Sequence, residues 1–313
     1  MKTIKWVIAH EPEELFVRAA NHFVKELEQR QPGKFDIEVM TKSGFAHKYN
    51  DGQLESMDSL IKLAEDGAID MAHTTTTSVA RTYSNDFFAL ELPFLFESHE
   101  HATAVLDGPI GRQIRDTVKP MKSLAFTYSG GFRMLVGNKA CHSVEDIASL
   151  SQRVNSGPVA SRIFEAIGAE TKHYALELSP TAIEEGLIDS SDCTYPRFYG
   201  MDFNKTATAI NDTRHSLFAT NILINNQTWN SLTADEQRDF QTAANLCATK
   251  ERQESIDDIK ITTERALRDG VTITSLSESE RTKWKEATNG IYGKLEHLFT
   301  DGLVDAIRAA NPA

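Results

Sequence analysis

Apolar and polar positions along the first 75 residues follow the periods of strands and helices in turn. Residues 4–9 form a short apolar run with β-branched side chains, which predicts a strand. Apolar residues from Leu15 to Leu27 recur at steps of three and four, which indicates an amphipathic helix that residues 31–33 end. Residues 35–39 alternate as a half-exposed strand does. This strand–helix–strand unit has the spacing of a parallel sheet.

The same alternation continues to the end of the chain and restarts after about residue 125. A long strand-like stretch at 123–138 is interrupted by Gly130-Gly131. Thr233 and Glu236 form a capping-box pattern at the start of a long predicted helix. The further predicted strands are 68–72, 152–155, one from 187, 216–225 and 271–274, and the further helices 54–63, 97–106, 110–118, 161–167, 179–187, 234–268, 277–298 and 303–309.

These elements predict two α/β halves, with a chain that crosses between them more than once. We expect residues 1–125 and about 213–250 to form domain I, and residues 126–212 and about 251–313 to form domain II. A cleft between two α/β domains is where small ligands usually bind.

Charge changes this picture. The chain has 313 residues, with 45 acidic and 33 basic side chains and a formal net charge of -12. Such a chain is repelled by a phosphate backbone, so nucleic acid is not expected as a partner. It also contains no run of 18 apolar residues, which excludes an obvious transmembrane helix. Any anion that it binds must be held by a few local cations.

Cysteine usage and the N-terminus are uninformative about compartment. Cys141, Cys193 and Cys247 show no metal-ligand spacing, and we expect buried, inert thiols. The apolar stretch after Lys5 is too short for a secretory signal. We therefore expect either a cytoplasmic protein or one whose secretory signal peptide has been removed from this sequence.

Motifs of catalysis are absent from the sequence. It contains no GxSxG, GxxxxGK[ST] or HExxH pattern, and the histidines His99 and His101 beside Glu100 are a poor metal site. We therefore expect no catalytic residue, metal or cofactor.

Two arginines stand out because they interrupt apolar strands. Arg133 follows Gly130-Gly131-Phe132, and Arg153 lies in Gln152-Arg153-Val154 twenty residues later. Such side chains need a partner when buried. One interpretation is a structural ion pair or an exposed edge strand. The other is a pair of guanidiniums that bind a carboxylate, whose geometry arginine matches.

The order of several short motifs resembles the DctP-type substrate-binding proteins of tripartite ATP-independent periplasmic (TRAP) transporters. Each motif is weak alone, but together they cover nearly the whole chain in consistent order. The matching segments are Asp66-Gly67-Ala68-Ile69-Asp70, Leu92-Pro93-Phe94, Gly131-Phe132-Arg133, Arg153-Val154-Asn155, Phe164 to Ala169, and Glu185 to Asp189.

The resemblance implies a two-domain periplasmic-binding-protein-like α/β fold. It would have a mixed sheet in each domain, a cleft between the domains and long helices that span both. It also implies that Arg153 forms a salt bridge with a ligand carboxylate and that Arg133 assists. Further contacts are implied for the loops at His10-Glu11 and Thr74-Thr75, although the run of threonines could instead cap a helix.

The segment after Asp189 departs from the family pattern. The family commonly has the pattern D-G-x-E-N/W-P there, whereas this chain has Asp189-Ser190-Ser191-Asp192-Cys193-Thr194-Tyr195-Pro196, with Cys193 in place of the usual Asn. The resemblance therefore implies that the far end of the ligand, away from its carboxylate, has different contacts in this chain. The polar residues at the implied site suit a hydroxylated or amine-bearing ligand. Tyr195, Phe198 and Phe218 would form an apolar wall, or else belong to the core.

We therefore expect an extracytoplasmic solute receptor that binds a small organic acid and delivers it to a TRAP membrane permease. A sulfonate is the alternative ligand class. The protein would be a periplasmic monomer whose signal peptide is missing from this sequence. Two rival hypotheses are an enzyme that uses Asp192 and Cys193 in the same cleft, and a sensor that passes the ligand signal to a membrane receptor.

Overall fold

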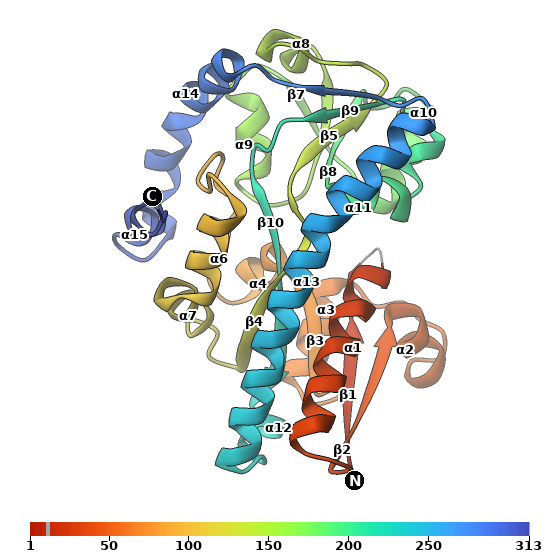
Figure 1. Cartoon of the computed structure of the whole chain (residues 1–313), viewed down its shortest axis with the longest axis vertical. Coiled ribbons are helices and arrows are strands. Elements are labelled where there is room, and N and C mark those ends of the chain that lie inside the picture. The colour runs from red at the N-terminus through yellow and green to blue at the C-terminus, as the bar shows by residue number, and fades with distance from the viewer. Residues whose placement is uncertain (11–12, 313) are drawn as a thin grey trace.

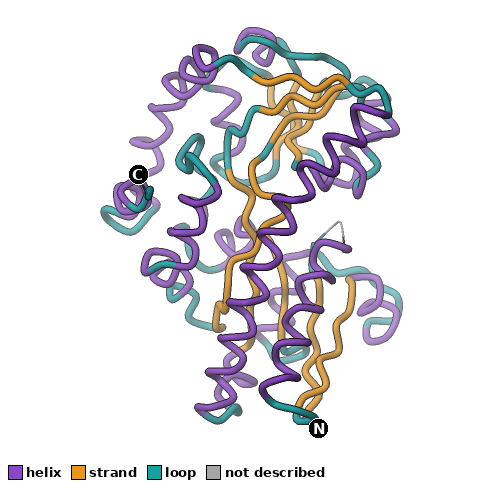
Figure 2. The backbone as a smooth tube through the Cα atoms, viewed as in Figure 1, coloured by secondary structure: helices purple, strands orange, loops and turns teal. Residues whose placement is uncertain are grey.

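The computed structural model describes residues 1–10 and 13–312, whose strands form two separate sheets (Figures 1 and 2). The first sheet contains, in spatial order, β2 (Phe35–Thr41), β1 (Lys2–Ile8), β3 (Met71–Thr75), β10 (Leu217–Asn225) and β4 (Met121–Phe132). The second contains β11 (Thr272–Ser275), β9 (Ala209–Asp212), β5 (Met134–Gly137), β8 (Ser190–Cys193), β6 (Ser151–Val154) and β7 (Glu170–His173).

Both sheets are mixed, as predicted. In the first, β1 is parallel to β2 and β3, whereas β10 is antiparallel to β3 and β4. In the second, β6 is parallel to β7 and β8, whereas β5 is antiparallel to β8 and β9. The parallel pairs are joined by crossover segments that contain helices, which such pairs require.

Helices surround both sheets (Figure 1). Those before β4 are α1 (Glu13–Arg30), α2 (Lys42–Tyr49), α3 (Met57–Glu65), α4 (Thr76–Thr82), α5 (Asp86–Ala89), α6 (His99–Asp107) and α7 (Pro109–Arg115). Those after it are α8 (Val144–Ala148), α9 (Ala160–Glu165), α10 (Ser179–Glu184), α11 (Tyr195–Gly200), α12 (Asn226–Asn230), α13 (Ala234–Arg268), α14 (Glu278–Leu295) and α15 (Leu303–Ala309). No helix within the described ranges is long and apolar enough to cross a bilayer.

Helix α13 runs alongside both halves, as Figure 1 shows. The predicted capping box is confirmed, since the Thr233 and Glu236 side chains each accept a hydrogen bond from the other residue's backbone N–H. Its buried face begins with Phe240 and continues through small residues as far as the buried Glu251 and Arg252, and it packs against α1 and β4. Its later part contacts α11 and β11 of the second half. The long helix that spans both halves is therefore present.

The chain passes from the first sheet to the second at Arg133, between β4 and β5. The pattern had placed the interruption at Gly130-Gly131, where the structure instead has a bulge in the pairing of β4 with β10. Both glycines have positive φ, and a Cβ on Gly130 would lie 2.3 Å from the Thr194 hydroxyl oxygen. Glycine is needed there for conformation and for close approach.

The division into domains at the predicted boundaries stays a prediction. The chain enters the second sheet after Phe132 and returns to the first between Asp212 and Leu217. Helix α14 packs on α8 and α9, but the following α15 contacts α5 and α7. Any assignment of the C-terminal segment must account for contacts with both halves.

Several predicted elements differ in detail. The strand expected at 68–72 begins only at Met71, because Gly67 ends the preceding turn in a left-handed conformation and three more residues reach the sheet. The pattern missed β7, whose sequence ETKH is polar, and β9, whose sequence AIND has two adjacent apolar residues but no alternation. It also missed the short helices α2, α4, α5, α8, α11 and α12.

Candidate functional site

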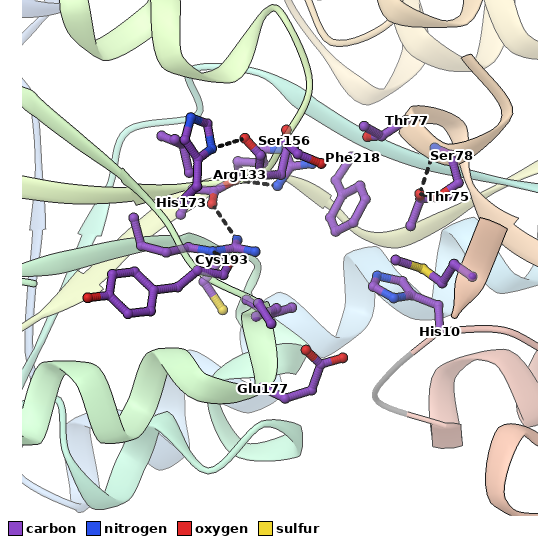
Figure 3. Close-up of a pocket in the computed structure, with 18 of the residues that line it drawn as sticks. His10, Thr75, Thr77, Ser78, Arg133, Ser156, His173, Glu177, Cys193 and Phe218 are labelled. Carbon is purple, nitrogen blue, oxygen red and sulfur yellow. Dashed lines mark hydrogen bonds and ion pairs between the residues drawn. The ribbon is translucent and has the colours of Figure 1, made fainter. Parts of the chain in front are cut away.

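A cavity of about 360 Å³ lies between the two sheets, and residues from both halves line it (Figure 3). Figure 3 shows His10, Thr75 and Phe218 on one side of it, with His173 and Cys193 on the opposite side. The lining residues are His10, Met57, Thr75, Thr77, Ser78, Arg81, Arg133, Arg153, Val154, Asn155, Ser156, His173, Tyr174, Ala175, Leu176, Glu177, Asp192, Cys193, Arg197 and Phe218.

The two predicted arginines meet at Asp192, and we call these three residues the anchor cluster. Strand β8, which carries Asp192, lies between β5 and β6 in the sheet, so Arg133 before β5 and Arg153 on β6 approach it from either side. Arg153 Nη1 lies 3.1 Å from Asp192 Oδ1, and Arg133 Nη1 bonds to Oδ2. The interpretation as a structural ion pair therefore holds. Both arginines also line the cavity, and their binding of a ligand carboxylate stays a prediction.

Burial shapes the charges of this cluster. The Arg133, Arg153 and Asp192 side chains are 6%, 8% and 2% exposed. Burial by itself would raise the pKa of Asp192, but the charges of the two arginines outweigh it and the pKa lies below the ordinary aspartate value. Burial lowers the pKa of Arg153 against the opposing effect of Asp192. The Asp192 carboxyl is therefore ionised at neutral pH, beside two guanidiniums, groups that keep their charge in proteins.

A third guanidinium, that of Arg197 on α11, was missed by sequence reasoning. Its Nε donates to Ser129 Oγ at 2.8 Å, and its Nη2 bonds to His10 Nε2. Arg133 and Arg197 both lie against the Phe218 ring, 3.8 and 4.6 Å from its centroid. The argument that singled out Arg133 applies equally to Arg197, a lone cation in the apolar run Tyr195 to Phe198.

His10 lines the cavity at the end of β1, as predicted. Burial, and then the nearby charge of Arg197, lower the pKa of His10 well below the ordinary value, so the imidazole is neutral. Because Nε2 accepts from Arg197, the ring proton belongs on Nδ1. Glu11, the other residue predicted in this loop, lies outside the described residues.

The threonine run contributes Thr75 but not Thr74 to the cavity. Thr75 is the N-cap of α4, where its Oγ1 accepts from Ser78 N at 3.2 Å, so the predicted alternative of a helix cap holds at a residue that also lines the cavity. Thr74 is fully buried in β3. Thr77, one turn further, donates to the buried carboxyl of Glu91, whose pKa burial raises.

Cys193 lines the cavity, whereas Tyr195 does not and packs in the apolar core of the second half. Burial raises the pKa of the Cys193 thiol to about 12, so it is protonated at neutral pH and is a poor nucleophile. Cys141, Cys193 and Cys247 are all buried and form no disulfide, as predicted. No group of three or more His, Cys, Asp or Glu suited to a metal ion occurs in the described part of the chain.

Loops of the second half complete the lining and were also missed. Asn155 and Ser156 follow β6, and the loop 173–177 follows β7. Arg153 Nε donates to Tyr174 O at 2.9 Å, so the anchor cluster also fixes this loop. The sequence offered only one way to find these loops. They follow the carboxyl ends of parallel strands, where ligands bind in α/β sheets.

Two α/β halves that both line one cavity have the architecture of the binding proteins that close around a ligand by hinge motion. The chain belongs to the DctP family of TRAP-transporter solute-binding proteins, since residues 8–297 match the family described as bacterial extracellular solute-binding protein, family 7. The resemblance seen in the motifs is therefore confirmed. The family consists of periplasmic solute-binding proteins, so the chain is a binding protein and not an enzyme.

Individual relatives are distant in sequence but similar in fold. The C4-dicarboxylate-binding periplasmic protein DctP of Vibrio cholerae is 21% identical over 295 residues, which cover 94% of this chain and 86% of the relative. A TRAP periplasmic solute-binding protein from Polaromonas sp. JS666, bound to D-erythronate, has 20% identity and a TM-score of 0.87, with 100% of both chains covered. One from Citrobacter koseri with bound D-glucuronate has 24% identity and a TM-score of 0.82, also over 100% of both chains.

Proposed function

We propose that the cavity binds a small organic acid anion whose carboxylate is held by Arg153 and Arg133. The observation that carries this proposal is the convergence of these two buried guanidiniums, with one carboxylate between them, on a cavity that both halves line. Two guanidiniums beside one counter-ion leave positive charge for a ligand, and arginine binds carboxylates with good geometry. The named ligands of the relatives, C4-dicarboxylates, D-erythronate and D-glucuronate, are all carboxylates.

The rest of the lining supports a hydroxylated acid. The opposite side of the cavity presents the hydroxyl groups of Thr75, Thr77 and Ser78, and Asn155 and Ser156 add an amide and a hydroxyl. These groups already hydrogen-bond within the protein, but a hydroxyl or an amide can make more than one such bond, so each can also donate to or accept from a ligand hydroxyl. His10, protonated on Nδ1, is a further donor.

The family supports a place in transport. A TRAP solute-binding protein would capture its ligand in the periplasm, close its two halves around it and present the closed form to a membrane permease. We propose this role for the chain, acting as a monomer. A sensor role would use the same cavity, and ligand uptake by vesicles that contain the cognate permease would favour transport over sensing.

A thermal-shift screen of the wild-type protein against organic acids tests the ligand class. The panel contains D-glucuronate, D-erythronate, succinate and sulfonates of similar size. A ligand at about 100 times its Kd stabilises the native state by about 2.7 kcal/mol, which raises Tm measurably. A better response to the sulfonates would move the assignment to the alternative ligand class.

Arg153→Ala should weaken the best ligand on the order of 100-fold, because truncating one member of a buried charge pair costs about 2–5 kcal/mol. Arg238→Ala is the matched control, since Arg238 is 70% exposed and pairs only with a neighbouring surface aspartate. Unchanged binding by a folded Arg153→Ala protein would refute the anchor assignment.

A further inference from the structure

Helix α4 of the first half carries Arg81, whose side chain hydrogen-bonds directly to the second half. Arg81 Nη1 donates to Ser156 Oγ at 2.8 Å, and Ser156 lies in the loop that follows β6. Both residues line the cavity and both reach solvent, so this bond lies at the rim of the cavity. Figure 3 shows Ser156 between His173 on one side and Thr77 and Ser78 on the other.

The guanidinium of Arg81 is held in place by its own half. Its Nη2 lies 2.9 and 3.1 Å from the two carboxylate oxygens of Asp58 on α3, and 3.2 Å from Ser78 Oγ on α4. Asp58 itself does not line the cavity. An arginine fork that is already fixed by a carboxylate loses little further freedom when it forms another bond. The first half therefore presents Nη1 of Arg81 to the second half as a preorganised donor.

The loop that carries Ser156 packs closely on the first half. A Cβ added to Gly157 would lie 3.2 Å from Thr77 Cγ2 and 3.5 Å from Phe88 Cε1, on α4 and α5. Gly157 N donates to Asn155 Oδ1 at 2.7 Å, so the loop forms a tight turn of its own. Asn155 and Ser156 also line the cavity. One short turn of the second half therefore contacts both the cavity and the first half.

We infer that Arg81 is a positioning residue that holds the two halves together at the rim of the cavity and so determines how long a bound ligand stays. Its bond to Ser156 forms only while the loop lies on α4, so the bond stabilises the closed arrangement relative to an open one. A ligand leaves when the halves separate, and loss of a charge-assisted hydrogen bond makes that separation more frequent. This inference rests on the proposed function of the cavity, but it concerns the release of the ligand and not its recognition.

Stopped-flow measurements of association and dissociation test the inference, with D-glucuronate and D-erythronate as probes. Arg81→Ala should raise the dissociation rate constant roughly 10-fold, the effect of losing one charge-assisted hydrogen bond, and should change the association rate constant much less. Ser156→Ala should have a similar effect, and the double variant should not exceed either single variant, because all three lack the same bond. The control Arg238→Ala, which removes an exposed arginine, should follow the wild type.

Asp58→Ala distinguishes this positioning role from a direct attraction between Arg81 and the anion. Removing the carboxylate makes the surroundings of Arg81 more positive, so a direct attraction would slow dissociation. The positioning role predicts the opposite result, a several-fold faster dissociation, because the guanidinium loses the group that fixes it. Slower dissociation from Asp58→Ala, or unchanged dissociation from Arg81→Ala, would overturn the inference while leaving the proposed function intact.

A second measurement needs no ligand and decides the matter if neither probe binds. Spin labels at His47→Cys on α2 and Glu184→Cys on α10, two exposed positions in opposite halves, report the distance between the halves. The natural cysteines are buried. Adding Arg81→Ala should shift the distance distribution of the ligand-free protein toward longer values. That shift without a bound acid would refute the proposed ligand class but not the role of Arg81, whereas identical distributions would refute both.

Discussion

The two walls of the cavity differ in kind. The wall from the second sheet contains buried charges, with Arg133 and Arg153 bonded to Asp192. The wall from the first sheet presents neutral groups, among them Thr75 and the uncharged imidazole of His10. The buried charges of the cavity therefore come from the second half, whereas the first half supplies neutral groups and the partly exposed Arg81, which pairs with Asp58. We expect the charged wall to determine affinity for an acid and the neutral wall to distinguish one acid from another.

The charged wall also contrasts with the molecule as a whole. The chain has a net charge of -12, yet its cavity concentrates arginines. Surface carboxylates beyond about 8–10 Å are largely screened by salt, whereas buried charges are not. The global acidity therefore does not oppose the binding of an anion inside.

The largest expected effect separates the two walls directly. Arg133→Ala should weaken the best-binding acid on the order of 100-fold, because it removes a buried charge. Ser78→Ala, on the neutral wall, should weaken it by less than about 10-fold, because a neutral hydrogen bond contributes about 1 kcal/mol. Isothermal titration calorimetry measures both. A larger loss for Ser78→Ala than for Arg133→Ala would reverse the comparison.

The next effect concerns the place where the two walls touch. Gly130→Ala should destabilise the fold by about 2–4 kcal/mol, because the new Cβ would combine a positive φ with an overlap against Thr194. Gly168→Ala is the matched control, since Gly168 has a similar φ of 85° and no atom near the added Cβ. The Gly168→Ala variant should lose only about 1 kcal/mol in free energy of unfolding.

Urea denaturation of both glycine variants gives the difference. If both variants lose the same free energy of unfolding, glycine is required at position 130 only for its backbone conformation, and not for the close approach of Thr194 to β4.

The smallest expected effect is a pH dependence of the stability of the fold, caused by Glu251 on α13, the helix that runs along both halves. Glu251 is buried, accepts from Tyr128 N at 2.6 Å, and has its pKa raised to about 7 by burial. The folded state therefore keeps the proton at a pH where the unfolded chain loses it. The stability that this proton provides is complete below about pH 4.5 and is lost as the pH rises through 7.

Glu251→Gln mimics the protonated form. As the pH rises from 5 to 8, its free energy of unfolding should therefore increase relative to that of the wild type by on the order of 1–3 kcal/mol, and its Tm should rise relative to the wild-type Tm. Thermal unfolding at the two pH values measures this, with the exposed Glu286→Gln as control. A constant difference between Glu251→Gln and the wild type would mean that Glu251 does not titrate in this range.

Much of the fold follows from local patterns. The predicted bounds of α13, 234–268, are those observed, because its capping box and its apolar spacing are both local signals. Strands β7 and β9 could not be found in the same way. Each has only four residues and no apolar alternation, and hydrogen bonds to neighbouring strands make them part of a sheet.

The candidate site was predictable where a charge interrupts an apolar segment. Arg133, Arg153 and Asp192 were singled out on that basis or by their motifs, and all three line the cavity. Thr74 and Tyr195 were named with them but do not line it, because alternation along β3 and the packing of α11 direct these side chains into the interior. Their predicted contacts with a ligand have no support in the geometry.

By itself, the sequence determined the α/β class, the long helix, the family and the positions of two buried arginines, because periodicity, caps and short motifs are carried by neighbouring residues. The tertiary structure decided the partnerships. Arg133, Arg153 and Asp192 are 20 and 39 residues apart in sequence order, and only the placement of β8 between β5 and β6 makes one carboxylate the counter-ion of both arginines. Charge compensation depends on distance in space, which no local pattern records.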